Sequence, residues 1–341
     1  MNAELRVGSL EETITVTGES PVVDVQSTRA QSIIDREVLA AIPSSRNVNG
    51  IQAIIPGMGT SGDDGGIGGS MQGGASNIHG GRSADSRIHA DGINMGWAGG
   101  NGGGGQMPQV AASQEVVMTT SGGLAEAETA GVVFNAIPRE GSNTLSGQFN
   151  FSGSNGALQG SNYTQALKDA GLRAPFELLS VYDSSGMVGG KILQDKLWFY
   201  AVYRQVGGKR TVPGMFFNKN AGNPDVWTYE PDTSRPAANE NTIRNGNVRI
   251  TWQAAPRHKL GFAADITRIC DCPRSQTASL SPEANAGNYQ IDSPKRQIYG
   301  EWTSPLSNRL LLDAVVLDHV HRAGRQRHNV FFPAGTTARL I

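Results

Sequence analysis

The sequence predicts an α+β domain followed by the antiparallel strands of an incomplete transmembrane β-barrel, with about seven strands. Three observations support this fold class. Glycine is concentrated before residue 144, where the predicted elements are short. After residue 144, apolar and polar residues alternate with a period of two, as they do in strands with one apolar face. In that second part, short and long connections also alternate, as in an up-and-down barrel.

The composition of the 341 residues excludes several classes of protein. Lysine and arginine (29) balance aspartate and glutamate (30), so no basic excess attracts nucleic acid. Only 17% of the residues are charged and 44 are glycine, which indicates many turns and close backbone approaches. No apolar stretch approaches about 18 residues, so no transmembrane helix is expected. Residues 1–6 lack the pattern of a signal peptide, so the chain is either cytoplasmic or begins downstream of its natural start.

The part before residue 144 consists of short predicted elements. Residues 5–17 are rich in β-branched side chains and predict one strand or two. Asp35 is a suitable N-cap for a helix that ends at Ile42, before Pro43. Apolar residues at helical spacing predict a second helix over 45–55. Between positions 57 and 105, 19 of 49 residues are glycine, so this segment must lie over or inside another structure.

The part after residue 144 contains seven runs with strand-like alternation. In one of them, Val248, Ile250 and Trp252 point to one face, while polar residues point to the other. The bulky set suits a lipid-facing surface and the polar or small set suits a lumen. The runs are 145–152, 187–193, 197–203, 245–253, 260–266, 297–303 and 310–320.

The connections between these runs favour a barrel over a soluble β-sandwich, which is the alternative because its strands also alternate. Short turns near residues 194, 256 and 306 alternate with long connections over 153–181, 207–242 and 271–294. In an antiparallel sheet this places all tight turns at one end, as in outer-membrane barrels. Aromatic residues near the strand ends suit interfacial girdles; they are Trp198, Tyr200, Tyr203, Trp252, Tyr299 and Trp302.

Several motifs follow one another in an order that is more specific than any one of them. Residues 12–18 read Glu-Thr-Ile-Thr-Val-Thr-Gly, and the two predicted helices contain Val38–Pro43 and Ile51–Gly57. Further motifs are Gly81-Arg82 with Ala90–Ile93, Ala130–Asn135 with Gly141–Asn143, and Gly189–Ile192 with Asp195–Phe199. In this order they resemble the plug domain and first barrel strands of TonB-dependent outer-membrane receptors. Within that family they resemble the Oar-like branch, which carries an N-terminal carboxypeptidase-regulatory-like domain.

The resemblance implies three regions and an incomplete barrel. Residues 1–18 would be the end of the regulatory-like domain and a TonB-box-like segment, and residues 19–143 an α+β plug. Residues 144–341 would be the N-terminal part of the outer-membrane β-barrel. Because the family has about 22 strands, the chain is expected to be a fragment. The sequence departs from the family pattern at Ile137-Pro138-Arg139 and in the long glycine run 99–105.

The function that the resemblance implies is energised uptake of an unidentified ligand across the outer membrane of a Gram-negative-type bacterium. The expected partners are TonB of the inner-membrane motor, outer-membrane lipid and the extracellular ligand, with no nucleic acid. Two alternatives remain open. One is an Oar-like surface adhesion or binding protein without active import, and the other is a soluble secreted β-protein that binds glycan with its aromatic residues.

Two groups of site residues are expected. The TonB-box-like residues Thr13, Ile14, Thr15, Val16 and Thr17 form an extended segment that can add a strand to a partner's sheet, or they belong to an ordinary strand of the preceding domain. The plug motif comprises Arg82, Asp91 and Gly92. Its charged residues are expected to anchor the plug in a polar lumen, with a ligand role as the less favoured alternative.

No pattern of catalytic residues is present, so we expect no enzyme activity, no cofactor and no metal. The glycines between 65 and 74 lack the Gly-Lys-Ser/Thr ending of a phosphate-binding loop. Cys270 and Cys272, even with His258, match no structural zinc pattern and form either a disulfide or free thiols. The histidine pairs His319 and His321, and His79 and His89, have no accompanying set of metal ligands.

Overall fold

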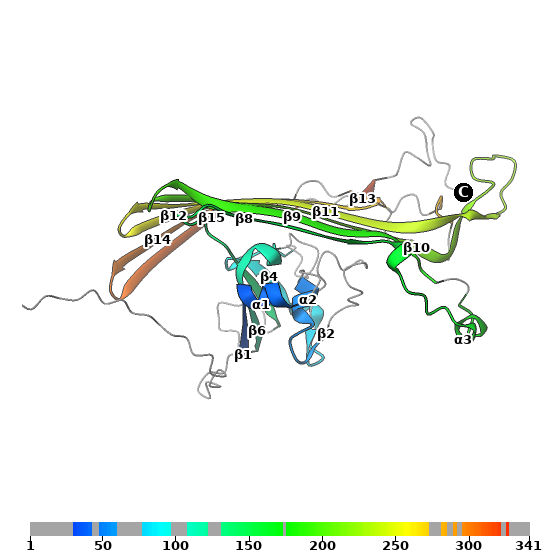
Figure 1. Cartoon of the computed structure of the whole chain (residues 1–341), viewed down its shortest axis with the longest axis horizontal. Helices are drawn as coiled ribbons and strands as arrows, with labels where there is room; N and C mark the ends of the chain where they lie inside the picture. Colours follow the sequence, from blue (N-terminus) through cyan, green and yellow to red (C-terminus); the bar gives the residue numbers. More distant parts are fainter. Residues whose placement is uncertain are drawn as a thin grey trace, which may run out of the picture.

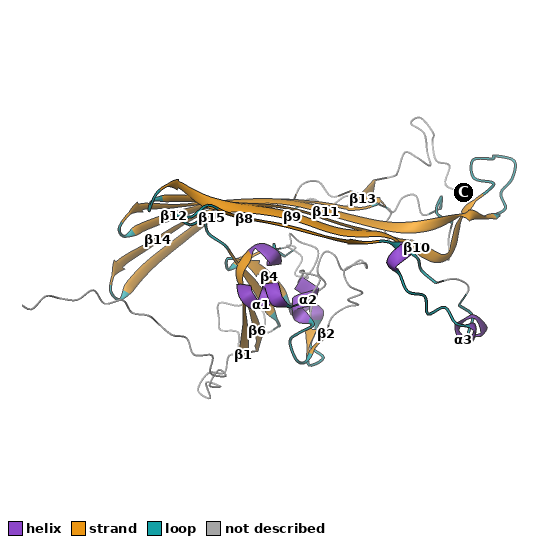
Figure 2. Ribbon diagram, in the orientation of Figure 1, coloured by secondary structure: helices purple, strands orange, loops and turns teal. Residues whose placement is uncertain are grey.

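The computed structural model contains two main sheets, one packed against a face of the other (Figure 1). Figure 2 shows that helices are few and short beside the strands. Among the described residues, no helix is both long and apolar enough to cross a membrane. The structure describes residues 30–42, 48–59, 77–96, 108–121, 131–172, 175–272, 281–284, 289–291, 295–321 and 325–326.

The smaller sheet is mixed and has the order β1-β6-β7-β4-β5. Its strands are antiparallel except that β4 pairs with β7 in parallel. Its buried residues, among them Phe134, Met118 and Val116, form their own apolar core with the helices. The strands are β1 (Ala30–Asp35), β4 (Arg87–Ala90), β5 (Ile93–Asn94), β6 (Ser113–Ser121) and β7 (Val133–Pro138), with β2 (Met58–Gly59) paired to β3 (Asn77–Ile78) beside them.

The helices of this part lie close to where the sequence predicts them. Helix α1 (Arg36–Ala41) begins at Asp35, whose carboxylate accepts a hydrogen bond from the Val38 amide at 2.9 Å, which confirms the predicted cap. Helix α2 (Val48–Gln52) is shorter than the predicted 45–55, and residues 43–47 lie outside the described part. Two 3₁₀ turns complete this part, η2 (Ser83–Asp85) and η3 (Val110–Ala112).

The larger sheet has seven antiparallel strands in the order β15-β14-β12-β11-β10-β9-β8, with β13 and β16 attached at its side. Seven strands are the number that the sequence predicts. They are β8 (Ser146–Ser154), β9 (Leu178–Leu193), β10 (Leu197–Asn218), β11 (Pro231–Ala255), β12 (His258–Asp271), β14 (Lys295–Ser307) and β15 (Leu310–Val320). The small elements are η4 (Gly156–Leu158), α3 (Gln165–Asp169), β13 (Tyr289–Ile291) and β16 (Arg325–Gln326).

One of the predicted long connections is wrong, because two strands continue well beyond the alternating runs. Strand β10 extends to Asn218 and β11 begins at Pro231, so their connection is 219–230 rather than 207–242. The two strands keep pairing over this extension, from Thr211 with Ala238 to Asn218 with Pro231, although the register is irregular. Backbone pairing therefore persists where the apolar alternation that predicts a strand has ended.

The two faces of the larger sheet differ as the alternation predicts. On the outer face Val248, Trp252 and Phe262 are 44%, 47% and 48% exposed. On the inner face Asn245 and Thr251 are 2% exposed. Three of the predicted girdle residues are wrong. Tyr200 and Tyr299 are buried on the inner face. Trp198 is two residues from Tyr200 on β10, so its side chain also points inward, and it donates to Asn143 in the linker 139–145 between the two sheets.

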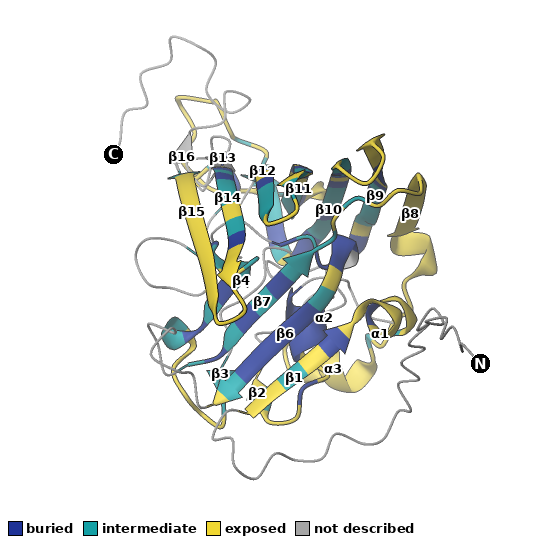
Figure 3. Cartoon of the chain, turned by 90° about the vertical axis from the view of Figure 1, so that its left-hand side faces the viewer, coloured by how far each residue is buried: buried dark blue, intermediate teal, exposed yellow. Residues whose placement is uncertain are grey.

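The larger sheet is open among the described residues. Strands β8 and β15 form its two edges. Figure 3 shows β15 as an exposed strand, whereas β6 of the smaller sheet is largely buried and β7 is partly buried. The described strands therefore do not close into a barrel.

Candidate functional site

Arg249 on β11 connects the smaller sheet to the wall formed by the larger one. Its guanidinium donates to Asp91 Oδ2 at 2.6 Å and to Glu301 Oε1 at 2.6 Å. The same group donates to the Tyr299 hydroxyl at 2.9 Å, and that hydroxyl lies 3.3 Å from Asp91. The Arg249 side chain is only 5% exposed. Charge-assisted bonds of this length, removed from solvent, are stronger than hydrogen bonds between neutral groups.

A tight turn presents Asp91 to Arg249. Asp91 and Gly92 link β4 to β5 and both have positive φ angles, 55° and 75°, as in a two-residue hairpin of type I′. The turn is fastened to β7, because the Asp91 amide donates to the Ala136 carbonyl and the Gly92 amide to the Asn135 side chain, each at 3.0 Å. The Asp-Gly sequence therefore fixes both the turn and the position of the carboxylate.

The linker between the two sheets adds a second ion pair to this cluster. Glu140 accepts from Lys259 Nζ at 2.8 Å and 2.9 Å and lies 3.5 Å from Arg249. Three carboxylates, those of Asp91, Glu140 and Glu301, thus surround two cations. We call Asp91, Glu140, Arg249, Lys259, Tyr299 and Glu301 the plug–wall cluster.

Two glycines leave the space that this arrangement needs. A Cβ at Gly261 would collide with the Glu301 side chain, so glycine lets Glu301 lie across β12 toward Arg249. A Cβ at Gly141 would collide with the backbone carbonyl oxygen of Phe199. The linker can therefore pass directly over β10 only without a side chain at that position.

A small apolar contact lies beside the plug–wall cluster. Ala112, Met187, Tyr200 and Val202 form a buried group between the two sheets. Arg139 donates to the Tyr200 hydroxyl at 3.3 Å and its guanidinium lies 5.2 Å from the centre of that ring. The linker also holds Asn143, which accepts from the Trp198 indole at 2.8 Å. The contact between the sheets is therefore mostly polar.

The structure separates the two charged residues of the predicted plug motif. Asp91 lies in the plug–wall cluster, whereas the Arg82 side chain is 82% exposed, with Asp85 at 4.0 Å. Arg82 lies before η2 and not on a strand, so it does not anchor the smaller sheet as expected. The predicted segment Thr13 to Thr17 lies outside the described residues. Sequence reasoning missed Arg249 and Glu301, although a charged residue on an inward strand position is the signal that would have found them.

A cavity of about 1230 Å³ lies at the end of the sheet opposite the short turns. It is formed by the β8–β9 connection, including Gln159 and Phe176, together with Pro213 of β10. Gln159 ties this connection together by accepting from the Leu178 amide at 2.7 Å. The cavity therefore belongs to the same end of the molecule as the 219–230 connection.

The 219–230 connection is held by polar contacts at its base. Lys219 donates to Glu230 at 2.8 Å, and this bond raises the pKa of the Lys219 ammonium. Trp227 and Tyr229 are 72% and 50% exposed, yet each polar atom is bound to the backbone, at Pro224 and Phe216 respectively. Their ring faces are thus fixed and open to solvent.

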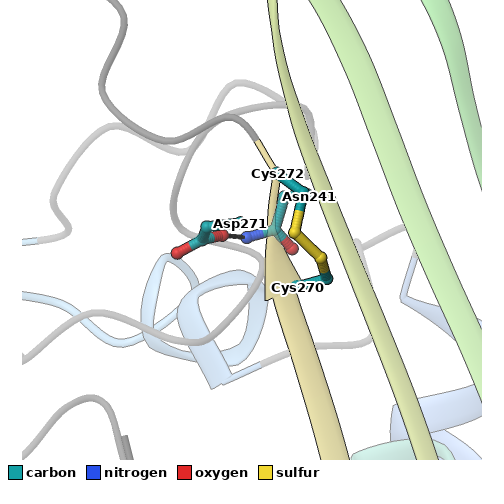
Figure 4. The surroundings of a disulfide bond; sticks show 4 residues. All are labelled: Asn241, Cys270, Asp271 and Cys272. Atoms are coloured by element: carbon teal, nitrogen blue, oxygen red, sulfur yellow. Dashed lines mark hydrogen bonds between the residues drawn. A yellow bond between two sulfur atoms is a disulfide. The ribbon is translucent and has the colours of Figure 1, made fainter. Parts of the chain in front are cut away.

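Cys270 and Cys272 form a disulfide at the end of β12 (Figure 4). Asp271 lies between them and accepts a hydrogen bond from the Asn241 side chain on β11. The Cys272 amide donates to the Glu240 carbonyl at 2.8 Å. In the described part of the chain, no group of three His, Cys, Asp or Glu residues is arranged to hold a metal.

Comparison with known proteins identifies the class to which this architecture is similar. No family model matches the chain. Over 213 residues it is 27% identical to the TonB-dependent transporter Oar of Myxococcus xanthus, a match covering 59% of this chain and 19% of that protein. The ferric enterobactin receptor PfeA of Pseudomonas aeruginosa, solved as the Q482A mutant, aligns with a TM-score of 0.56 and 15% identity. The outer-membrane transporter YddB of Escherichia coli aligns with a TM-score of 0.58 and 13% identity.

These matches cover only part of each relative. The alignment takes in 85% of this chain and 41% of PfeA, and 84% of this chain and 38% of YddB. The chain is thus similar in fold, and to Oar in sequence, to TonB-dependent outer-membrane receptors. It spans about a fifth of the length of Oar and about two fifths of the solved receptors. Fold, sequence match and apolar outer face together place it in the outer membrane of a Gram-negative-type bacterium.

Proposed function

We propose that the chain is the plug and first barrel strands of a TonB-dependent receptor that takes up an unidentified ligand with energy from the inner membrane. Residues 19–143 are the plug and residues 144–341 the N-terminal part of the barrel. Residues 1–18 are the end of a regulatory-like domain with a TonB-box-like segment. The observation that carries the proposal is the plug–wall cluster, in which a buried guanidinium joins the turn at Asp91 to the wall.

The contacts suit a plug that is retained and then displaced. The smaller sheet has its own apolar core, so its folding does not require the wall. Few apolar residues are shared across the contact, where Arg249 pairs with Asp91 and lies 3.5 Å from Glu140 of the linker. Breaking a buried ion pair on one side costs about 3–5 kcal/mol. Such a contact holds the plug at rest and yields to an applied force without unfolding the plug core.

TonB would supply that force through the segment Thr13 to Thr17. An extended, β-branched segment can add as a strand to the edge of a partner's sheet, with main-chain hydrogen bonds providing the affinity. Ligand would enter from the end with the long connections, where the 1230 Å³ cavity lies. Pulling on the N-terminal segment would then release Asp91 from Arg249 and open a path along the wall.

A proline substitution tests the TonB segment. Val16→Pro removes a backbone donor from the proposed added strand, so it should weaken binding to the purified periplasmic domain of TonB at least tenfold. The control Val16→Thr keeps the donor and the β-branched shape and should bind within about twofold of wild type. Isothermal titration calorimetry measures both. Equal affinity for the two variants would contradict the proposed role of this segment.

A surface adhesion or binding protein without active import is the second candidate. The exposed rings of Trp227 and Tyr229, fixed by their polar atoms, favour it because preorganised aromatic faces bind partners at low entropic cost. Deletion of TonB separates the two candidates. Loss of ligand uptake in the strain without TonB supports the receptor. Adhesion that is unchanged by the deletion, with no ligand uptake in either strain, supports the second candidate.

A further inference from the structure

The outer face of the larger sheet consists of rows of residues at equal height, because register pairs connect adjacent strands. One row contains Trp252 and Trp302, which are 47% and 36% exposed. On β11 and β12 the next rows upward are apolar or small, through Ile250 and Val248 up to Gly246, which is paired with Tyr203 of β10. On β14 and β15 these rows also hold Arg296 and Asp318, which neutralise each other in an ion pair. The outer face thus carries an apolar band with tryptophan below and tyrosine above, as at two membrane interfaces.

The row above this band is basic. Arg244 on β11 and Arg268 on β12 are direct register partners, and both side chains are exposed on the outer face. Eight residues separate Arg244 from Trp252, which is about 26 Å along a strand and about 20 Å along the normal of a tilted barrel. An apolar band is about 25 Å tall. The two guanidinium groups therefore lie at its upper edge, on the side of the long connections.

Like charges directly opposite one another destabilise a strand pair, since their Cβ atoms are about 5 Å apart. Among the described residues, no carboxylate forms an ion pair with Arg244 or Arg268. Their in-row neighbour on β10 is the uncharged Gln205. Arg296, diagonal to Arg268 on β14, already pairs with Asp318 at 2.7 Å. Glu240, further up β11, already pairs with Lys209 at 2.9 Å.

We propose that Arg244 and Arg268 bind the phosphate groups of a phosphorylated glycolipid in the outer leaflet of the outer membrane. Planar guanidinium groups bind phosphate oxygens in pairs, and a phosphate between them converts their repulsion into attraction. The acyl chains of the same lipid would lie along the apolar band below, against Val248 and Ile266. This inference rests on the proposed membrane-spanning sheet and does not involve the TonB segment.

The experiment uses the full-length protein in detergent micelles and measures binding of purified bisphosphorylated lipid A. In the double variant Arg244→Gln/Arg268→Gln the affinity should fall at least tenfold. Arg257→Gln, an exposed arginine in the short turn at the other end of β11, is the matched control and should change it less than twofold. Chemically dephosphorylated lipid A should bind wild type as weakly as the bisphosphorylated lipid binds the double variant.

Further readouts make the result independent of a folding defect. Arg244→Lys/Arg268→Lys keeps the charge but loses bidentate binding, so it should give an intermediate affinity. Without lipid, the glutamine variant should melt at a higher temperature than wild type, because the repulsion between the two arginines is gone.

Equal affinity of wild type and the glutamine variant, or equal binding of dephosphorylated lipid, would overturn the proposal. Equally tight binding of phosphatidylglycerol would overturn the assignment to the outer-leaflet glycolipid. All these variants should bind TonB as wild type does, so a failure of this proposal can be told apart from a failure of the proposed function.

Discussion

At the scale of single residues, Arg249 is a buried cation whose partners come from distant parts of the sequence. Its guanidinium is removed from water and shared between Asp91 of the plug and Glu301 of the wall. A buried charge of this kind is tolerated only when its partners are in place. The contact thus depends on groups that lie 158 and 52 residues away along the sequence.

Replacing this arginine tests its role directly. Arg249→Met leaves the carboxylates of Asp91 and Glu301 partly buried without their cation, so the free energy of unfolding should fall by about 3–5 kcal/mol. The measurement is thermal or denaturant unfolding of the purified receptor in detergent. Lys219→Met, at an exposed pair with Glu230, is the control and should have little effect. Equal losses in the two variants would show that Arg249 is not a special anchor.

The residue scale also separates what local sequence predicts from what it does not. The N-cap at Asp35 and the turn at Asp91-Gly92 are set by short-range chemistry, so a few adjacent residues predict them. The motif that contains Arg82 includes no local rule that requires a buried partner for its side chain. Its exposure agrees with its position before a short 3₁₀ turn.

At the scale of elements, the strands of the larger sheet are defined by their two faces. Alternation predicts which residues of β11 and β12 lie outward, because side chains of a strand point to opposite faces. It does not predict where the strands end, since β10 and β11 keep pairing through polar sequence. Alternation also does not predict which face an isolated aromatic side chain takes. Tyr200 and Tyr299 therefore lie buried on the inner face and not, as expected, at a membrane interface.

A charge on the outer face tests whether the sheet lies in lipid. Val248→Arg places a cation in the middle of the apolar band and should destabilise the inserted protein by about 2–4 kcal/mol. Val226→Arg, an exposed valine in the 219–230 connection, is the matched control and should insert normally. The fraction of folded full-length protein in lipid vesicles, measured by heat-dependent electrophoretic mobility, compares the two. Normal insertion of Val248→Arg would contradict a lipid-facing band.

At the scale of the whole molecule, the seven-strand sheet has two unpaired edges, β8 and β15. Unpaired strand edges expose backbone donors and acceptors that lipid cannot satisfy. The plug covers only part of the inner face, and β15 is exposed over most of its length. Closing this wall therefore requires strands beyond the seven that the structure describes.

A polypeptide of residues 1–341 alone should form no closed pore. In planar lipid bilayers it should give no discrete conductance steps, and on electrophoresis it should lack the heat-dependent shift of a closed barrel. The full-length receptor with all its strands provides the positive control for the shift. Regular conductance steps from the 1–341 polypeptide would mean that seven strands close in a way that the open sheet does not indicate.

The sequence by itself determined the two-faced strands, the α1 cap and the likeness to TonB-dependent receptors. These depend on composition, on spacing within about ten residues and on the order of motifs. Only the tertiary structure decided that Asp91 meets Arg249, that Glu301 lies over Gly261 and that Arg244 stands opposite Arg268. Each of these contacts joins separate strands, so it depends on register and docking, which local residue preferences do not encode.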